Sequence, residues 1–196
     1  MRLVLATRNA HKVAELGALM AGHDLEGLPE RLPVVEETGA SFAENALLKA
    51  RAAADALGTA VIADDSGVQS AALGGAPGVR SARFAGPQAS DAENLRKLLR
   101  DAPVGDKLTY VCVIAFVDPA SGAAWTVEGR CSGTLAAEPR GANGFGYDPA
   151  FVPDDVVDPG RPGRTMAELA PAEKAAISHR SRAVAALRTR LEEHGS

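Results

Sequence analysis

The chain has 196 residues, of which 46% are hydrophobic and 23% charged, and its formal net charge is −4. A chain of this length forms one domain, or two lobes around a shared core, and this composition is typical of a soluble globular protein. The negative charge argues against a general nucleic-acid or membrane-surface binder, which is normally basic, but it is compatible with a small anion held by a few local cations.

The N-terminus and the two cysteines predict a cytoplasmic protein. The sequence MRLVLATRNA lacks the long apolar stretch of a signal peptide, and no run approaches the ~20 apolar residues of a membrane span. Cys112 and Cys131 lie in strand-like segments outside any CxxC or Cys/His cluster. We therefore expect both thiols to be reduced and packed.

The N-terminal segment predicts a strand, a turn and a helix. Residues 2–6 form a short apolar run, which the polar sequence TRNAHK (residues 7–12) connects to KVAELGALM. In that second segment the apolar side chains recur at helical spacing: Val13, Leu16, Leu19 and Met20. The spacing predicts a helix that follows the turn.

A longer helix and a strand come next. Residues 41–58 are rich in Ala and Leu, Ser41 and Glu44 make a capping box, and Gly58 can terminate the helix. The segment TAVIADDSG (residues 59–67) then predicts a strand that ends at two adjacent carboxylates, Asp64 and Asp65. Like charges at this spacing repel, and desolvating them costs several kcal/mol unless a positive group is near.

The middle of the chain alternates loops, one helix and strands. LGGAPGVRSARFAG (residues 73–86) is glycine-rich and predicts an irregular loop, and a second capping box at Ser90 and Glu93 starts a helix over residues 91–101. The β-branched and aromatic run Leu108–Val117 predicts a central strand. Further strand, interrupted by glycines, is expected over AWTVEGRCSGTLA, and GANGFGYDPAFVP predicts a loop that leads into a short strand.

The C-terminal part is mainly helical. A Pro/Gly/Asp stretch, Pro153–Gly163, precedes a third capping box at Thr165 and Glu168, and residues 171–194 are helical apart from a break near Ser178. Strands and helices therefore interleave, with hairpin-like strands in the middle. The fold class is α/β with a mixed rather than a purely parallel sheet.

The turn over residues 7–12 is a candidate phosphate site. It offers the backbone N–H groups of a helix N-terminus together with a hydroxyl, an amide and a lysine, which suit an anion. It is not a Walker A loop, because it lacks GxxxxGK[ST]. A simple N-cap with solvated side chains remains the alternative.

The acidic residues are a candidate metal site: Glu36, Glu37, Asp64 and Asp65. Mg²⁺ prefers hard oxygen ligands, retains several waters and typically shares its shell with substrate phosphates. Such an ion would also relieve the repulsion between Asp64 and Asp65. Alternatively, either aspartate could cap the Asp-Ser-Gly turn that follows, and local features leave these two readings open.

Two further groups can contact a ligand. In GFGYDP (residues 144–149) the glycines allow close backbone approach, an aromatic ring can stack on a flat ligand, and Asp148 can accept hydrogen bonds. Near the C-terminus lies a basic set: Lys174, His179, Arg180 and Arg182. A plain aromatic-anchored loop and a solvated charged face are the respective alternatives.

Together these four candidate groups are compatible with fewer functions than any one of them is alone. The sequence has no GxSxG elbow and no paired Cys/His arrangement, so it does not point to a nucleophilic side chain. A phosphate turn, a carboxylate metal site, a stacking loop and a cationic cluster fit metal-assisted attack of water on a nucleoside polyphosphate.

Five segments carry a resemblance to a known family. LATRNAHKVAEL, EETGASFAENALLKA, IADDSGVQSAALGGAPGVRSARFAG, GFGYDPAFVP and TMAELAPAEKAAISHRSRA occur in order between residue 3 and about residue 187. They resemble the inosine triphosphate pyrophosphatase family, whose members hydrolyse non-standard purine nucleoside triphosphates (ITP, dITP, XTP) to the monophosphate and pyrophosphate. The resemblance implies a single domain over residues 1–196, with a long mixed sheet flanked by helices, two lobes with a nucleotide cleft between them, a homodimer and Mg²⁺ dependence.

The resemblance also implies roles for individual residues. Glu37 and Asp65 would ligate Mg²⁺, and Asp65 would also orient or deprotonate the attacking water; Asp64 would support it, and Glu36 is a weaker alternative ligand. The implied substrate contacts are Thr7, Arg8, Asn9, Ala10, His11, Lys12, Ser66, Phe145, Gly146, Tyr147, Asp148, Lys174, His179 and Arg180. A donor from His179 or Arg180 facing a 6-oxo group would select against adenine, which presents an amino group there.

The sequence departs from the family pattern at two positions. Arg8 stands where many relatives have glycine, which would stiffen the turn or add a cation. Ala170 precedes Pro171 in place of a capping Ser or Thr, which would fray that helix start. Two other functions stay open: a pyrophosphatase for modified pyrimidine nucleotides, against which the Ser-His-Arg run argues, and a nucleotide sensor without turnover, against which Lys12, Asp65 and Lys174 argue.

Overall fold

A computed structural model describes residues 2–20, 24–33, 35–155, 160–161 and 163–194; the side chains of His11 and His194 lie outside the description. The chain divides into two compact units. Unit 1 contains residues 1–65, 112–129 and 180–196, and unit 2 contains residues 66–111 and 130–179. Each unit has its own hydrophobic core. The expectation that the whole chain is one domain stays a prediction.

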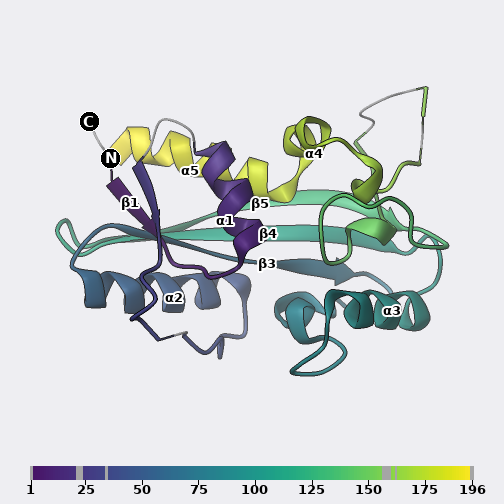
Figure 1. The fold of residues 1–196 in the computed structure, drawn as a ribbon, viewed down its shortest axis with the longest axis horizontal. Coiled ribbons are helices and arrows are strands. Elements are labelled where there is room, and N and C mark those ends of the chain that lie inside the picture. Colours follow the sequence, from purple (N-terminus) through teal and green to yellow (C-terminus); the bar gives the residue numbers. More distant parts are fainter. Residues whose placement is uncertain (1, 21–23, 34, 156–159, 162, 195–196) are drawn as a thin grey trace. The chain divides into compact units, whose positions relative to one another are not determined.

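Within the described residues, six strands form one sheet in the order β2-β1-β3-β4-β5-β6 (Figure 1). Their bounds are Arg2–Leu5 (β1), Asp24–Gly27 (β2), Val61–Ser70 (β3), Lys107–Asp118 (β4), Ala123–Leu135 (β5) and Phe151–Pro153 (β6). β1 pairs in parallel with β2 and with β3, whereas β5 and β6 are antiparallel. The predicted α/β class with a mixed sheet is therefore confirmed.

β3 differs from the prediction in the position of its end. The strand continues through Asp64 and Asp65 to Ser70, so the prediction that it ends at the acidic pair is wrong. Tertiary packing overrides the Asp-Ser-Gly turn pattern. The backbone N–H of Val68 donates to the hydroxyl of Ser81 (2.9 Å), and a Cβ at Gly67 would lie 2.3 Å from that same oxygen. Glycine therefore lets the strand run past this close contact.

In unit 1, helices cover both faces of the sheet. Helices α1 (Ala10–Leu19) and α5 (His179–His194) lie on one face and α2 (Phe42–Leu57) lies on the other (Figure 1). α1 begins two residues earlier than the turn pattern suggested, so Ala10 belongs to its first turn. Leu16 and Met20 are buried, but Val13 is 37% exposed, so the apolar face of α1 is narrower than the spacing suggested.

The caps of α2 explain its position in the sequence. The hydroxyl of Ser41 accepts a hydrogen bond from the N–H of Glu44 (3.2 Å), and Gly58 ends the helix at φ 63°. The Glu44 carboxylate accepts from the N–H of Ala40 (2.7 Å), one residue before the position that a standard capping box uses. Both predicted ends of this helix are confirmed.

Unit 2 contains the glycine-rich loop, helix α3 (Asp91–Asp101) and the segment up to the end of helix α4 (Pro171–Ile177). The capping box of Ser90 and Glu93 starts α3 as expected, and the break at Ser178 separates α4 from α5. The short 3-10 helices are η1 (Gly78–Arg83), η2 (Asp148–Ala150) and η3 (Met166–Glu168). The third capping box therefore starts only one 3-10 turn, η3. At the start of α4, the Glu173 carboxylate accepts from the N–H of Ala170 (2.7 Å), which is the half of a capping box that needs no side chain at Ala170.

β5 is one continuous strand, although its glycines suggested interruptions. A Cβ at Gly133 would lie 2.4 Å from the carbonyl oxygen of Val152, so this glycine allows the close approach of β6. Cys112 and Cys131 are free and buried, as expected. Among the described residues, none of the helices combines the length and the apolar character that crossing a membrane requires. Part of the stretch Pro153–Gly163, residues 156–159 and 162, lies outside the described residues.

Candidate active site

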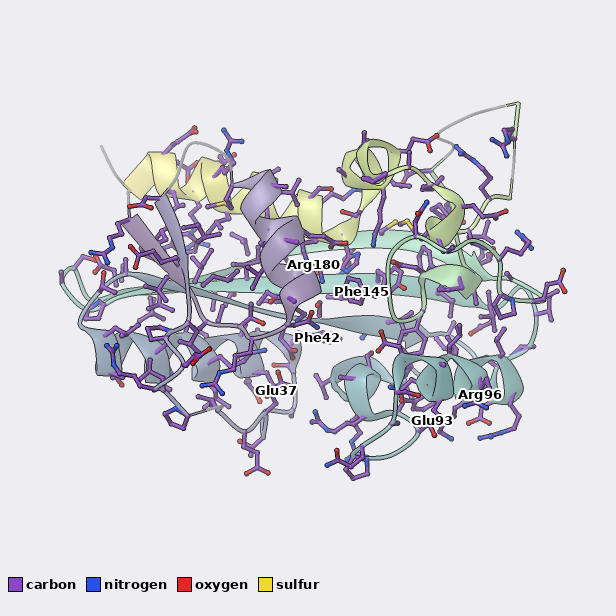
Figure 2. All side chains as sticks on the ribbon, viewed as in Figure 1. Glu37, Phe42, Glu93, Arg96, Phe145 and Arg180 are labelled. Carbon is purple, nitrogen blue, oxygen red and sulfur yellow. The ribbon has the colours of Figure 1, made fainter. Side chains whose placement is uncertain are left out.

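β3 directs the two adjacent carboxylates to opposite faces of the sheet, because side chains alternate along a strand. Asp64 shares its face with Ile62, which packs in the core of unit 1 with residues of α1 and α5. Asp65 faces α2, where its Oδ2 accepts a hydrogen bond from the side-chain amide of Asn45 (3.1 Å). Figure 2 shows Arg180 on the α1–α5 side and Glu37 on the α2 side.

The Asp64 face is a buried ion-pair site. The Lys12 ammonium lies 2.8 Å from Oδ2 of Asp64, whose side chain is fully buried. Burial opposes ionisation, but the charges of Lys12, Arg180 and Lys49 outweigh it and lower the pKa of the Asp64 carboxyl group to about 2. Arg180 is 2% exposed and also contacts the carboxylate of Glu15. Asp64 is therefore a carboxylate at all physiological pH values and holds Lys12 in place.

The Asp65 face gathers two carboxylates around one lysine. The Lys49 ammonium lies 2.7 Å from Oε1 of Glu37 and 3.6 Å from Oδ1 of Asp65, and it donates to the backbone carbonyl of Asp64 (2.6 Å). Burial raises the pKa of the Asp65 carboxyl group, Lys49 lowers it, and the negative charge of Glu37 raises it, with a net upward shift. This environment leaves Asp65 more basic than an ordinary aspartate.

The donor set on this second face fits Mg²⁺. Within the described ranges, no group of three or more His, Cys, Asp and Glu side chains is arranged to hold a metal. Mg²⁺ does not require such a cage, since it is usually bound by one or two carboxylates together with waters and substrate phosphates. Glu37 and Asp65 already converge on one cation, the Lys49 ammonium. Glu36 is exposed, and Asp64 lies on the other face, so neither joins this pair.

The turn that the sequence predicts to bind phosphate caps α1. The side-chain oxygen of Asn9 accepts from the N–H of Lys12 (3.3 Å), and the N–H of Asn9 donates to the hydroxyl of Thr7 (3.3 Å). The guanidinium of Arg8 donates to the carbonyls of Glu30 (2.9 Å) and Leu32, so this arginine fixes the segment that precedes Glu37. Asn9 therefore caps α1, but the Lys12 side chain is only 15% exposed and pairs with Asp64, so the turn is not the simple N-cap with solvated side chains. Its role in phosphate binding stays a prediction.

In unit 2, the GFGYDP loop is organised around Asp148. Oδ2 of Asp148 accepts from the Lys174 ammonium (2.7 Å) and from the N–H of Phe145 (3.0 Å), and Oδ1 accepts from the hydroxyl of Tyr110 (3.0 Å). Lys174 also lies 5.2 Å from the centre of the Phe145 ring, within cation–π distance. Asp148 therefore acts within the protein as the acceptor that joins the loop to Lys174.

The remaining loop residues are also anchored. The N–H of Gly146 donates to the Asp91 carboxylate (2.9 Å), and the hydroxyl of Tyr147 donates to the carbonyl of Ser81 (2.7 Å). Gly144 has φ 76°, and a Cβ there would lie 2.0 Å from Oδ2 of Asp148. The glycine is required both by its backbone conformation and by the space that Asp148 occupies.

The other predicted residues lie close to these two groups along the chain. Ser66 directly follows Asp65 in β3 and is half-buried. His179 is 5% exposed and stacks on the ring of Tyr110, with the centroids 4.6 Å apart. Arg182 is exposed on α5 and fits the solvated-face interpretation. The His11 side chain is outside the described residues.

Comparisons with known proteins place the chain in a family. The model of the Ham1 family matches residues 3–190. The chain belongs to the Ham1 family. The resemblance noted in the sequence is thereby confirmed.

Relatives of this Ham1-family chain are similar over nearly their full length. A dITP/XTP pyrophosphatase from Geobacillus kaustophilus is 48% identical, over 97% of this chain and 94% of the relative. One from Coxiella burnetii is 43% identical, over 98% of each chain. Among solved structures, a HAM1 protein from Coxiella burnetii has a TM-score of 0.86 at 42% identity, covering 98% of this chain and 99% of that one. The Staphylococcus aureus Ham1 protein has a TM-score of 0.84 at 39% identity, covering 99% and 100%.

Sequence reasoning missed three residues of the candidate site: Asn45, Lys49 and Tyr110. Asn45 and Lys49 lie four residues apart on α2, so they share one helical face within an Ala-rich helix. Asn45 is buried on the face of α2 that packs against the sheet, where an apolar residue is normally expected. A polar residue and a lysine on that face could therefore have been recognised from the sequence as site residues. Tyr110 gave no such pattern, because an aromatic residue in a central strand is normally a core residue.

Proposed function

We propose that this chain is a nucleoside-triphosphate pyrophosphatase that converts ITP, dITP and XTP to the monophosphate and pyrophosphate. Relatives that match over nearly the whole chain at 48% identity bear the name dITP/XTP pyrophosphatase. The observation that carries the proposal is the convergence of Glu37 and Asp65 on the Lys49 ammonium, because phosphoryl transfer depends on positioned charges around the phosphates.

Mg²⁺ is the proposed cofactor, with Glu37 and Asp65 as its protein ligands. When bound, the ion would neutralise phosphate charge and polarise the phosphoryl group. The proposed triphosphate contacts are Thr7, Arg8, Asn9, Ala10, His11, Lys12 and Ser66. Among these, Lys12 is already held by Asp64 at 2.8 Å, so it is positioned before any substrate arrives.

Asp65 is the proposed general base. The side-chain amide of Asn45 holds its Oδ2, and its position beside Glu37 places the carboxylate at the proposed metal site, where it can reach a bound water molecule. Asp65 would orient a water molecule and accept its proton as the water oxygen forms a bond to the α-phosphorus. The bond from the α-phosphorus to the bridging oxygen breaks, and pyrophosphate leaves with that oxygen.

Recognition of the base is assigned to the second group: Phe145, Gly146, Tyr147, Asp148, Lys174, His179 and Arg180. A donor from His179 or Arg180 would bind the 6-oxo group of hypoxanthine or xanthine, which accepts a hydrogen bond. The 6-amino group of adenine is itself a donor, so the donor of the protein would face it without an acceptor. A buried donor without an acceptor costs about 1–3 kcal/mol, which corresponds to roughly 5- to 150-fold discrimination. The proposed base contacts come from both units, since His179 ends a segment of unit 2 and the next residue, Arg180, begins a segment of unit 1.

The cellular setting belongs to the same proposal. We expect a cytoplasmic homodimer that acts on free nucleotides and has no nucleic-acid or membrane partner. The acidic net charge of −4 supports the absence of a nucleic-acid partner. The rival functions are a pyrophosphatase for modified pyrimidine nucleotides and a nucleotide sensor without turnover.

A substrate panel tests the proposal. The purified protein is assayed with Mg²⁺ against ITP, dITP, XTP, ATP, GTP and modified pyrimidine triphosphates, and the phosphate product is identified. We expect pyrophosphate from ITP, dITP and XTP and much slower turnover of ATP. Release of orthophosphate would exclude cleavage between the α- and β-phosphates. A preference for pyrimidines would favour the first rival, and tight binding without turnover would favour the sensor.

A further inference from the structure

Tyr110 contacts two of the residues that the proposed function assigns to base recognition, His179 and Asp148. It lies on β4 and is 6% exposed. Its ring stacks on His179, with centroids 4.6 Å apart and planes 12° from parallel, and its hydroxyl donates to Oδ1 of Asp148 (3.0 Å). All three residues belong to unit 2.

The ring of Tyr110 fixes the plane of His179. On its other face, Tyr110 stacks on Phe151, which is fully buried, with centroids 4.3 Å apart. A ring that is stacked on both faces cannot turn without separating both contacts. The imidazole plane of His179 therefore follows a stack that begins in the core of unit 2, and its ring nitrogens lie in the plane that this stack sets.

The hydroxyl of Tyr110 fixes Asp148. With Oδ1 held by Tyr110, the carboxylate presents Oδ2 to the Lys174 ammonium (2.7 Å) and to the N–H of Phe145 (3.0 Å). Burial, followed by the charge of Asp148, raises the pKa of Tyr110 well above its ordinary value, so the phenol remains a donor. Loss of this donor would free the carboxylate to rotate and would release Lys174 and Phe145 from their positions.

We propose that Tyr110 is a positioning residue for base recognition, which acts through the stack on His179 and the hydrogen bond to Asp148. The inference rests on the proposed function and adds a residue that need not touch the substrate. It assigns a separate role to each half of the side chain: the ring orients the donor of His179, and the hydroxyl orients Asp148 with Lys174 and Phe145.

Two variants separate these roles. Tyr110→Phe removes the hydroxyl and retains the stack, and Tyr110→Leu removes both. For Tyr110→Phe we expect kcat/KM for ITP to fall about tenfold, the size of effect that one lost hydrogen bond to a buried charged group produces, mainly through KM. The ratio of kcat/KM for ITP to that for ATP should fall as well. Thr109→Val, on the same strand with its side chain on the opposite face, is the matched control and should keep wild-type values.

A double-mutant cycle and a spectroscopic measurement complete the test. Because the hydroxyl of Tyr110 acts through Asp148, adding Tyr110→Phe to Asp148→Asn should cause little further loss of kcat/KM.

The ring-current shift of the His179 ring protons, resolvable among 4 histidines by NMR, should persist in Tyr110→Phe and disappear in Tyr110→Leu. Wild-type kinetics and selectivity in Tyr110→Phe, or additive losses in the cycle, would overturn the inference. Absence of ITP turnover in the wild type would instead reject the proposed function, so the two failures are distinct.

Discussion

Asp64 and Asp65 are neighbours in β3, yet each carboxylate meets a different lysine on a different face of the sheet. Asp64 lies 2.8 Å from Lys12 of α1, and Asp65 lies 3.6 Å from Lys49 of α2. Strand alternation therefore resolves the repulsion that the sequence suggests, without one ion shared by both carboxylates. The alternation also separates their roles. Asp64 is the counter-ion of Lys12 and Arg180, whereas the carboxyl group of Asp65, beside Glu37, has a raised pKa.

The first prediction contrasts the two aspartates in stability. Asp64→Asn leaves Lys12 and Arg180 without their buried counter-charge and should lower the free energy of unfolding by about 3–5 kcal/mol. Asp65→Asn should be neutral or stabilising, because the environment of Asp65 already disfavours its charge. Urea unfolding at neutral pH measures both variants. Equal destabilisation by the two substitutions would contradict the division of roles.

The same pair gives a pH dependence. The folded-state pKa of Asp64 is about 2, below its ordinary value of 3.8, so the carboxylate contributes stability above about pH 4. That contribution is lost as the pH falls from about 4 to 2, because the unfolded state then binds a proton that the folded state does not. The wild-type protein should lose stability more steeply than Asp64→Asn over this window. Parallel unfolding curves would rule this contribution out.

The second prediction concerns Lys49. Lys49→Met removes the cation between Glu37 and Asp65, so the two carboxylates repel and the metal-free protein should be less stable. Millimolar Mg²⁺ should then raise the melting temperature of Lys49→Met more than that of the wild type, because the ion replaces the missing charge. Lys97→Met, which removes an exposed ion pair with Asp101 on α3, is the control and should show no such gain. An equal Mg²⁺ effect in all three proteins would argue against a metal site at Glu37 and Asp65.

The third prediction uses the two tyrosines. Burial raises the pKa of both Tyr110 and Tyr147, with Asp148 adding to the effect at Tyr110 and Asp91 at Tyr147. Ultraviolet titration should therefore show little tyrosinate near pH 10, where an exposed tyrosine is about half ionised. Because the folded state keeps these protons, stability falls as the pH rises above about 10 and the phenols of the unfolded chain ionise. Ordinary ionisation of both phenols in the folded protein would contradict the buried hydrogen bonds described for them.

The fourth prediction compares two glycines of one loop. Both Gly144 (φ 76°) and Gly146 (φ 63°) have positive φ, so alanine at either position carries a similar backbone penalty. Only at Gly144 would the new Cβ also meet Asp148, at 2.0 Å from Oδ2; at Gly146 nothing lies within 4 Å. Gly144→Ala should raise KM for ITP well above the value for Gly146→Ala, as measured by steady-state kinetics. Similar KM values would show that the Asp148–Lys174 contact does not matter for binding.

Local patterns predicted the helices and the mixed sheet well. The caps at Ser41, Gly58 and Ser90 are set by side chain–backbone hydrogen bonds within a few residues, so the sequence contains them. The end of β3 could not be predicted in this way. Its continuation to Ser70 depends on Ser81, a residue of η1 that meets Val68 only in the fold.

The candidate site shows the same limit. Asp65 and Glu37 were predicted as partners, and the structure places both next to Lys49. Asp64 was assigned a supporting role, but no sequence pattern indicated that Lys12 would pair with it. Asp148 was expected to accept hydrogen bonds, but the sequence did not indicate that Tyr110, Phe145 and Lys174 would donate to it. Such contacts join residues far apart in the sequence, so spacing cannot reveal them.

The role of Asp65 is tested most directly by the rate at which Asp65→Asn releases pyrophosphate from ITP, compared with the wild type at saturating Mg²⁺. The substitution preserves size and removes the proposed base, so the rate should fall by about 10²–10⁴-fold while circular dichroism and the unfolding curve remain those of a folded protein. Near-normal pyrophosphate release by folded Asp65→Asn would contradict the assignment of Asp65, rather than Asp64, as the general base.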